Sequence, residues 1–173
     1  MRHDTKTRRK NCSIYYTISK TSISNLPLTS YNYLSKKRMK MYYFAYDTNL
    51  DRKQMITRCP DARPKYSAIL PNYKLVFSGW SRELRSSVAT IKRQSNQKVL
   101  GGIYEVSPAD LKRLDKYMGY PDIVNRIKVS VWSGSDTPIE AETYILINQT
   151  QETPPSKEYL AIMQKGLKDW LTE

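Results

Sequence analysis

The most informative segment of the sequence is Tyr43-Phe44-Ala45-Tyr46-Asp47-Thr48-Asn49-Leu50. The apolar and aromatic residues 42–45 predict a short buried strand, which the polar residues Asp47, Thr48 and Asn49 break. We expect a short helix to follow over residues 50–58. A strand that stops before a helix N-terminus leaves backbone N–H groups available to bind an anion. The alternative from the pattern alone is a structural turn in which Asn49 is the helix N-cap.

The sequence on both sides of this segment contains more predicted strands than helices. Alternating and β-branched residues predict strands over residues 66–78, 87–92, 99–106, 127–132 and 139–147. The first of these is interrupted near Pro71-Asn72, and the polar residues 94–98 predict a hairpin connection. Gly101-Gly102 allows a bulge or a close approach of another segment.

Two further helices have clear boundary signals. Ser107, Pro108 and Asp110 form an S-x-x-D box with proline at the first helical position, and Gly119 follows the helix. The last helix begins at Ser156. Their apolar stripes are Leu111, Leu114 and Met118, and Leu160, Met163, Leu167 and Trp170. Together these elements predict an α+β fold, a small closed or curved mixed β-barrel flanked by short helices.

The composition excludes several classes of protein. The 173 residues include two cysteines, Cys12 and Cys59, which are too few for a disulfide framework. The single histidine, His3, excludes Ser/His/Asp triads, Cys/His dyads and histidine-rich zinc sites. No apolar run is long enough for a membrane span. Acid–base chemistry in this chain must therefore use Asp, Glu, Tyr or Lys.

The formal net charge of +13 is concentrated at the N-terminus. Residues 1–40 contain ten basic residues and one acidic residue, so they carry +9 of that charge. We therefore expect a basic, disordered tail over residues 1–40 and a domain over residues 41–173. The tail has three interpretations: a start site assigned upstream of Met39 or Met41, an organelle transit peptide, or an arm that binds nucleic acid or a membrane surface.

Residues 43–50 also resemble the Y-F-A-Y-G-S-N-L signature of the γ-glutamylcyclotransferase-like family. Further segments are similar to that family in the same order: Cys59-Pro60, Leu75-Val76-Phe77, and residues 88–91, 99–106, 111–129, 141–145 and 155–160. Of these, residues 111–129 resemble L-x-x-L-D-x-x-E-G-Y-P-x-x-Y-x-R-x-x-V. The resemblance extends from Met41 to about Lys168.

The resemblance implies a reaction as well as a barrel fold with a cavity at one end. In that family, the α-amine of a γ-glutamyl group attacks its own γ-carbonyl, which forms 5-oxoproline and releases an amine or amino acid. A glutamate transfers the proton, and the loop after the first strand holds the α-carboxylate. No metal or organic cofactor is implied. The substrate-binding positions in this sequence are Tyr43, Tyr46, Asp47, Thr48, Asn49, Leu50, Val124 and Arg126.

The sequence departs from the family at four functional positions. Met118 stands at the position of the catalytic glutamate, and a thioether cannot transfer a proton at neutral pH, although it can fill the core. Asp47 and Thr48 replace glycine and serine. The Asp47 carboxylate would repel an incoming α-carboxylate, or it caps the next helix. Val124 replaces a tyrosine, whereas Arg126 remains.

These departures predict a γ-glutamylcyclotransferase-family protein whose activity is impaired or lost. It is either a degraded paralogue or a protein that binds a small γ-glutamyl or amine-bearing ligand in the retained pocket. The first alternative is an active enzyme that uses Glu83, Glu105 or Glu142 as its acid. The second is a basic interaction module that acts through residues 1–40. We expect a cytoplasmic location unless residues 1–40 target an organelle, and contact with nucleic acid only through that segment.

Overall fold

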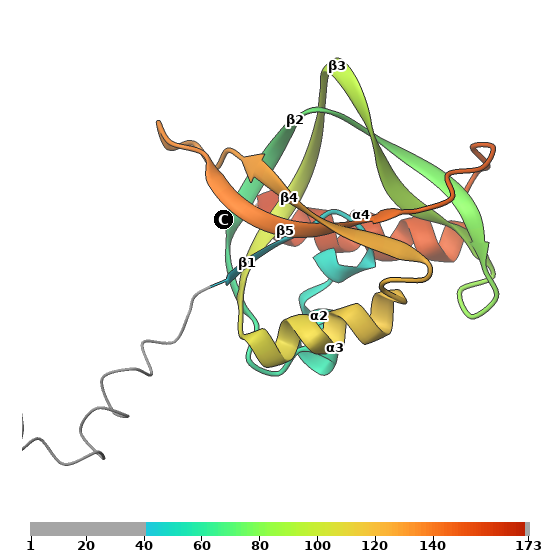
Figure 1. Ribbon diagram of the computed structural model, residues 1–173, viewed down its shortest axis with the longest axis horizontal. Helices are drawn as coiled ribbons and strands as arrows, with labels where there is room; N and C mark the ends of the chain where they lie inside the picture. Colours follow the sequence, from blue (N-terminus) through green and yellow to red (C-terminus); the bar gives the residue numbers. More distant parts are fainter. Residues whose placement is uncertain (1–40, 172–173) are drawn as a thin grey trace, which may run out of the picture. The chain divides into compact units, whose positions relative to one another are not determined.

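The computed structural model describes residues 41–171, and the predicted tail, residues 1–40, lies outside them. The elements in chain order are β1 (Met41–Ala45), the 3-10 helix η1 (Thr48–Leu50), α2 (Arg52–Arg58), β2 (Arg63–Ser81), β3 (Ser86–Val106), α3 (Pro108–Met118), β4 (Val124–Val131), β5 (Ile139–Leu146) and α4 (Lys157–Leu171) (Figure 1). The long strands β2 and β3 pair with each other along one side of the sheet, and α2 and α3 lie together at one end of it.

The five strands form one sheet in the order β2-β3-β1-β5-β4. β1 pairs antiparallel with β3 and parallel with β5, so it lies in the middle of the sheet. At the two edges, Ile69 on β2 and Trp132, just after β4, exchange backbone hydrogen bonds of 2.8 and 2.9 Å. The sheet therefore closes at this point, which confirms the predicted mixed barrel flanked by helices.

Residues 94–98, predicted as a hairpin connection, belong instead to the single long strand β3. The partner strand β2 shifts its register between Pro71 and Tyr73, where the sequence predicted an interruption. Asn72 and Asn96 have positive φ angles of 60° and 64°, which asparagine tolerates better than most residues. Both long strands bend in this region, so the polar segment curls the sheet rather than ending a strand (Figure 1).

The helix predicted over residues 50–58 is divided in two by a pair of aspartates. Asp47 Oδ1 accepts a hydrogen bond of 2.8 Å from the Asn49 N–H, which caps η1. Asp51 Oδ1 accepts hydrogen bonds of 2.9 and 3.1 Å from the N–H groups of Lys53 and Gln54, which caps α2. The N-caps are therefore Asp47 and Asp51, and Asn49 lies inside the first turn.

The boundary signals of the two later helices are confirmed. Ser107 Oγ accepts a hydrogen bond of 3.1 Å from the Asp110 N–H at the start of α3. Gly119 ends that helix in the left-handed conformation, with φ of 77°. Ser156 Oγ accepts a hydrogen bond of 3.2 Å from the Tyr159 N–H, just before α4. Both helix starts are thus fixed by local hydrogen bonds that the sequence already encodes.

Strand β1 supplies side chains to two hydrophobic clusters. Phe44 packs in one cluster together with Met163 of α4, whereas Tyr43 packs in the other with Leu114 of α3 and Trp170 of α4. Because successive strand residues point to opposite faces, a central strand needs apolar residues at every position. This explains why the decisive stretch of sequence is continuously apolar until Tyr46.

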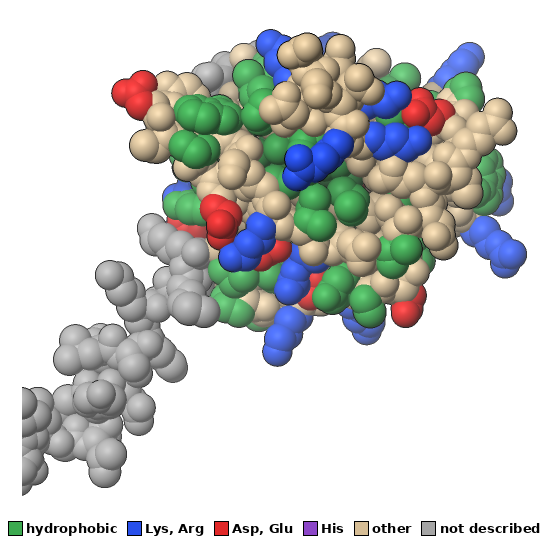
Figure 2. All heavy atoms as spheres, turned by 45° about the horizontal axis from the view of Figure 1, so that its top comes forward, with side chains coloured by type: hydrophobic (Ala, Val, Ile, Leu, Met, Phe, Trp, Pro, Cys, Tyr) green, Lys and Arg blue, Asp and Glu red, His purple; other side chains and the backbone are tan. Residues whose placement is uncertain are grey.

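None of the helices between residues 41 and 171 is long and apolar enough to cross a membrane. On the face shown in Figure 2, Lys and Arg side chains are distributed among apolar, acidic and other polar side chains. They do not gather into one continuous basic stripe on that face. The predicted basic interaction segment, residues 1–40, lies outside the described residues.

Candidate functional site

A cavity of about 560 Å³ lies where the loop after β1 meets the β2–β3 loop, the end of α3 and the start of β4. In Figure 1 the β2–β3 loop, the end of α3 and the start of β4 lie toward the right-hand end of the barrel. The wall includes five of the site residues predicted from the sequence: Tyr46, Asp47, Thr48, Met118 and Val124. The topology therefore brings together all four positions at which the sequence departs from the family pattern.

The loop after β1 is held in place by the buried side chain of Asn49. Its Nδ2 donates a hydrogen bond of 2.8 Å to the Tyr43 hydroxyl, and its Oδ1 accepts one from Arg58. Arg58 also donates to Thr48 Oγ1 at 3.4 Å. Tyr43, Asn49 and Leu50 are buried behind the loop and do not line the cavity. Their positions suit them to fix the loop, whereas Asp47 and Thr48 are the loop residues that face the cavity.

Asp47 places a buried carboxylate on the cavity wall. Its side chain is 7% exposed, and burial raises the pKa of this carboxyl above its ordinary value. The Asn49 N–H and the charge of Arg58 lower the pKa but do not outweigh burial. No cation forms an ion pair with Asp47 among the described residues 41–171. The carboxylate therefore accepts backbone N–H groups and is influenced by the charge of Arg58, but within residues 41–171 no cation pairs with it directly.

Met118 is the last residue of α3 and belongs to both the core and the cavity. It packs against the cluster that contains Leu114, and it also lines the cavity. Its Sδ lies 3.8 Å from Asn49 Nδ2, which donates to it. The two alternatives weighed for this residue, core filling and a vacant catalytic position, are therefore compatible. A thioether at this place offers the cavity a weak acceptor only.

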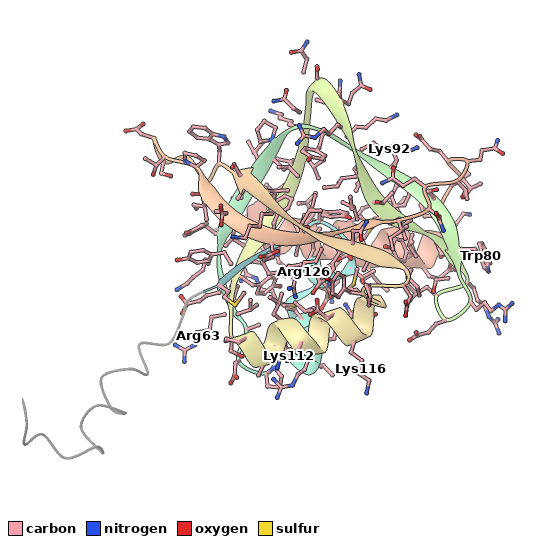
Figure 3. The ribbon with its side chains drawn as sticks, viewed as in Figure 1. Arg63, Trp80, Lys92, Lys112, Lys116 and Arg126 are labelled. Carbon is pink, nitrogen blue, oxygen red and sulfur yellow. The ribbon has the colours of Figure 1, made fainter. Side chains whose placement is uncertain are left out.

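Val124 and Arg126 lie on the same strand but have different surroundings. Val124 is buried and lines the cavity, where it presents no hydroxyl. Arg126 donates two hydrogen bonds to the carboxylate of Asp115 on α3, at 2.9 and 2.7 Å, and lies 3.7 Å from the Glu142 carboxylate. It does not line the cavity, and Figure 3 shows it between β4 and α3. Its guanidinium group therefore ties β4 to α3.

The three acids considered as replacements for the missing glutamate have different positions. Glu83 lies on the exposed β2–β3 loop and lines the cavity. Glu105 pairs with Lys65 at 3.0 Å, and Glu142 lies beside Arg126. Neither Glu105 nor Glu142 lines this cavity. Glu83 is thus the member of the three that can reach a ligand there.

Sequence reasoning missed much of the cavity wall. The missed polar and aromatic residues are Trp80, Arg82, Tyr117, Asp122, Tyr144, Asn148 and Tyr159. They come from separate strands, loops and helices, so no sequence spacing joins them. Tyr117, Asp122, Tyr144 and Tyr159 lie in segments that resemble the family, but the resemblance gave them no role in the site. Trp80 gave a different signal, because it is a large aromatic residue near a polar loop; it is 67% exposed and is labelled in Figure 3. No group of His, Cys, Asp and Glu within residues 41–171 is arranged to hold a metal ion.

Comparison with known proteins identifies what this chain resembles. A family model described as Gamma-glutamyl cyclotransferase, AIG2-like, matches residues 43–164. A solved structure described as a gamma-glutamyl cyclotransferase is 27% identical, with a TM-score of 0.72, over 76% of this chain and 80% of that chain. A human protein described as uncharacterized matches with the same identity, TM-score and coverage.

A more distant structure shares the fold. The protein YkqA from Bacillus subtilis is 23% identical over 82% of this chain and 53% of that chain, with a TM-score of 0.65. No curated protein sequence matches the chain.

Proposed function

Because the chain belongs to the Gamma-glutamyl cyclotransferase, AIG2-like family, we propose that it keeps the ligand cavity of that family with impaired or lost cyclotransferase activity. The lost activity is the release of 5-oxoproline from γ-glutamyl amines or peptides. The observation that carries this proposal is that Met118, which the sequence resemblance matches to the family's catalytic glutamate, lies on the cavity wall.

The chemistry of the reaction explains why this position matters. The substrate ammonium must lose a proton before its nitrogen attacks the γ-carbonyl, and the leaving nitrogen must gain one. The Met118 thioether can carry neither proton. Loss of a positioned general acid–base typically lowers the rate by about 10²–10⁴-fold. The substitution therefore removes the proton transfer and leaves the cavity open to a ligand.

The loop after β1 adds a second obstacle to the reaction. The family resemblance assigns its backbone N–H groups to the substrate α-carboxylate, but here Asp47 Oδ1 already accepts the Asn49 N–H. An incoming carboxylate would also meet the charge of Asp47, and like charges about 4 Å apart repel by about 4 kcal/mol at an effective dielectric near 20. Thr48 further narrows the loop by one methyl group. The altered loop thus weakens binding of a γ-glutamyl substrate, and Met118 removes the proton transfer that the same substrate needs.

A second candidate function is an active cyclotransferase that uses Glu83. The observation in its favour is that Glu83 lines the cavity, whereas Glu105 and Glu142 do not. Glu83 lies on an exposed loop, so reaching the substrate amine would require that loop to close over the ligand.

The experiment that separates the two candidates is a 5-oxoproline assay with γ-glutamyl-alanine and a γ-glutamyl amine. Under the main proposal, the wild-type protein releases little or no 5-oxoproline. Robust turnover that Glu83→Gln abolishes would contradict it and establish the second candidate. Glu140→Gln is the matched control, because Glu140 is also exposed but lies outside the cavity, 2.8 Å from Lys128 Nζ.

Repair of the altered positions provides a complementary test. Met118→Glu alone should not restore turnover, because Asp47 and Thr48 still obstruct the loop. The triple variant Asp47→Gly, Thr48→Ser, Met118→Glu should exceed each single variant, since substrate binding and proton transfer act together. Val124→Tyr would return the missing hydroxyl. Equal activity of the single and triple variants would contradict this explanation of the loss.

A further inference from the structure

The cavity has an unusual combination of side chains for a family whose substrates carry an α-carboxylate. Five aromatic residues line it: Tyr46, Trp80, Tyr117, Tyr144 and Tyr159. Three carboxylates line it as well, Asp47, Glu83 and Asp122, against a single cationic side chain, Arg82. Aromatic faces and carboxylates both attract cations, so the wall as a whole favours a positively charged ligand.

Asp47 is the buried member of the three carboxylates. Glu83 and Asp122 are exposed, whereas Asp47 is 7% exposed. A buried carboxylate is costly unless a cation or several hydrogen bonds compensate it. Within residues 41–171, Asp47 accepts the Asn49 N–H but forms no ion pair. The carboxylate therefore lacks a direct cationic partner, and it faces the cavity, from which one can reach it.

Arg58 does not fill this vacancy, although its charge influences Asp47. Its NH1 donates to Thr48 Oγ1 and Asn49 Oδ1, and its NH2 donates to Gln54 Oε1 at 2.6 Å. The guanidinium also lies over the Tyr117 ring, 4.0 Å from its centroid. These contacts hold Arg58 against the loop and α3, outside the cavity lining. A ligand is then left to supply the counter-ion of Asp47.

We propose that the cavity binds an organic ammonium ion whose nitrogen pairs with the Asp47 carboxylate and whose apolar body lies against the aromatic wall. The ligand carries no carboxylate beside its amine, because Asp47 itself occupies the Asn49 N–H at the end of β1. This inference deepens the proposed function and rests on it: the altered loop that disfavours a γ-glutamyl substrate favours a cation.

The direct test compares three probes of similar size by titration calorimetry with the full chain. They are 2-phenylethylammonium, 2-phenylethanol and phenylacetate, which share a benzene ring and a short chain but differ in charge. We expect the ammonium ion to bind at least about tenfold more tightly than the alcohol, and phenylacetate to bind most weakly. Equal binding of the ammonium ion and the alcohol, preferred binding of phenylacetate, or no binding of the ammonium ion would each overturn the proposal.

A charge-neutral variant then assigns the preference to one residue. Asp47→Asn keeps an oxygen that can accept the Asn49 N–H, so the cap of η1 is preserved while the charge is removed. The affinity for 2-phenylethylammonium should fall about tenfold or more, and that for 2-phenylethanol should stay within about twofold. Asp136→Asn is the matched control, since Asp136 is exposed and does not line the cavity. An unchanged ammonium affinity in Asp47→Asn would overturn the proposal.

The outcomes distinguish this inference from the proposed function. Release of 5-oxoproline by the wild-type protein would contradict the proposed loss of activity, whatever the probes do. Conversely, lack of turnover together with equal affinity for the ammonium ion and the alcohol would leave the loss of activity standing and overturn the ammonium site. If Asp47→Asn does not fold, the three probes on the wild-type protein still decide between these outcomes.

Discussion

Gly166 is a residue of α4 whose backbone lies against residues 50 and 51, just after the site loop, so its replacement by alanine tests how that helix positions the loop. A Cβ atom on this glycine would lie 2.5 Å from the Asp51 nitrogen, 2.6 Å from the Leu50 carbonyl carbon and 2.8 Å from Leu50 Cβ. Non-bonded carbon atoms pack about 3.5–4.0 Å apart. Two of the three atoms belong to the backbone, which cannot rotate away, so the helix or the loop must move by about 1 Å.

Two effects of opposite sign then compete in Gly166→Ala. Alanine is favoured over glycine inside a helix by about 1 kcal/mol, whereas overpacking costs about 1–3 kcal/mol. We use the upper part of the overpacking range because the short contacts involve backbone atoms. The net expectation is a free energy of unfolding lowered by about 1–2 kcal/mol. Because the displaced residues follow Asp47 and Thr48, the affinity of the cavity for a ligand should fall as well.

Urea unfolding measures the change, and Gln164→Ala is the matched control because Gln164 is exposed on the same helix. The control should stay within about 0.5 kcal/mol of the wild-type protein. A higher free energy of unfolding in Gly166→Ala would contradict the predicted overpacking, because the helix propensity of alanine would then outweigh any steric cost. It would mean that α4 does not press on the loop.

Three further changes test other contacts of the site. Met118→Ala should lower the free energy of unfolding by about 1–2 kcal/mol in urea, below the usual range for a fully buried residue, because one side faces the cavity. Trp170→Phe should cost about 1–3 kcal/mol in the same assay, because the buried Leu50 carbonyl loses the indole N–H at 3.0 Å. Burial alone would raise the pKa of Asp51, but backbone N–H groups and Lys165 outweigh it and lower the pKa. The stability advantage of the wild-type protein over Asp51→Asn should therefore be present above a pH of about 3.9 and disappear as the pH falls through the lowered pKa.

The helix boundaries were predictable because the groups that fix them are neighbours in the sequence. Ser107 binds the N–H of Asp110 three residues later, and Gly119 takes the left-handed conformation that ends α3. The first helix was harder to predict. Asp47 and Asp51 both cap, and their competition divides the segment into η1 and α2, which no single cap signal reveals.

Close contacts between distant segments were predictable only in part. Gly101-Gly102 signalled a close approach, and the structure places the Trp170 ring against Gly102. The glycine pair indicates that another segment packs closely against β3, but it does not indicate which segment. That depends on how α4 crosses β3. That crossing is set by packing along the whole helix, so a local pattern cannot supply it.

The position of Arg126 shows a different limit of sequence reasoning. Val124 and Arg126 are two residues apart on β4, so strand alternation assigns them to the same face. The long Arg126 side chain instead extends to Asp115 on α3, and Tyr144 donates to the same carboxylate at 2.8 Å. Strand alternation determines the face on which the Cβ atom lies, whereas ion pairs determine the position of the charged group of a long side chain. Val124 therefore lines the cavity, but the guanidinium group of Arg126 does not.

Asn49 links the two positions at which this chain departs most from its family. Its backbone N–H binds Asp47 Oδ1, and its side-chain Nδ2 contacts Met118 Sδ. A carboxylate introduced at position 118 would lie across this one residue from that of Asp47, and like charges repel more strongly at a buried site than in water. Under the proposed function, the two substitutions therefore act on the same local electrostatics. The family pattern has its acid at the end of the α3 segment beside a glycine in the loop, whereas this chain has its acid in the loop beside a neutral thioether. An acid on the helix can exchange a proton with the substrate amine, but an acid held on the loop N–H is fixed as a counter-ion. We therefore expect the negative charge on the loop, in place of one on the helix, to favour binding of a cation over turnover in this cavity.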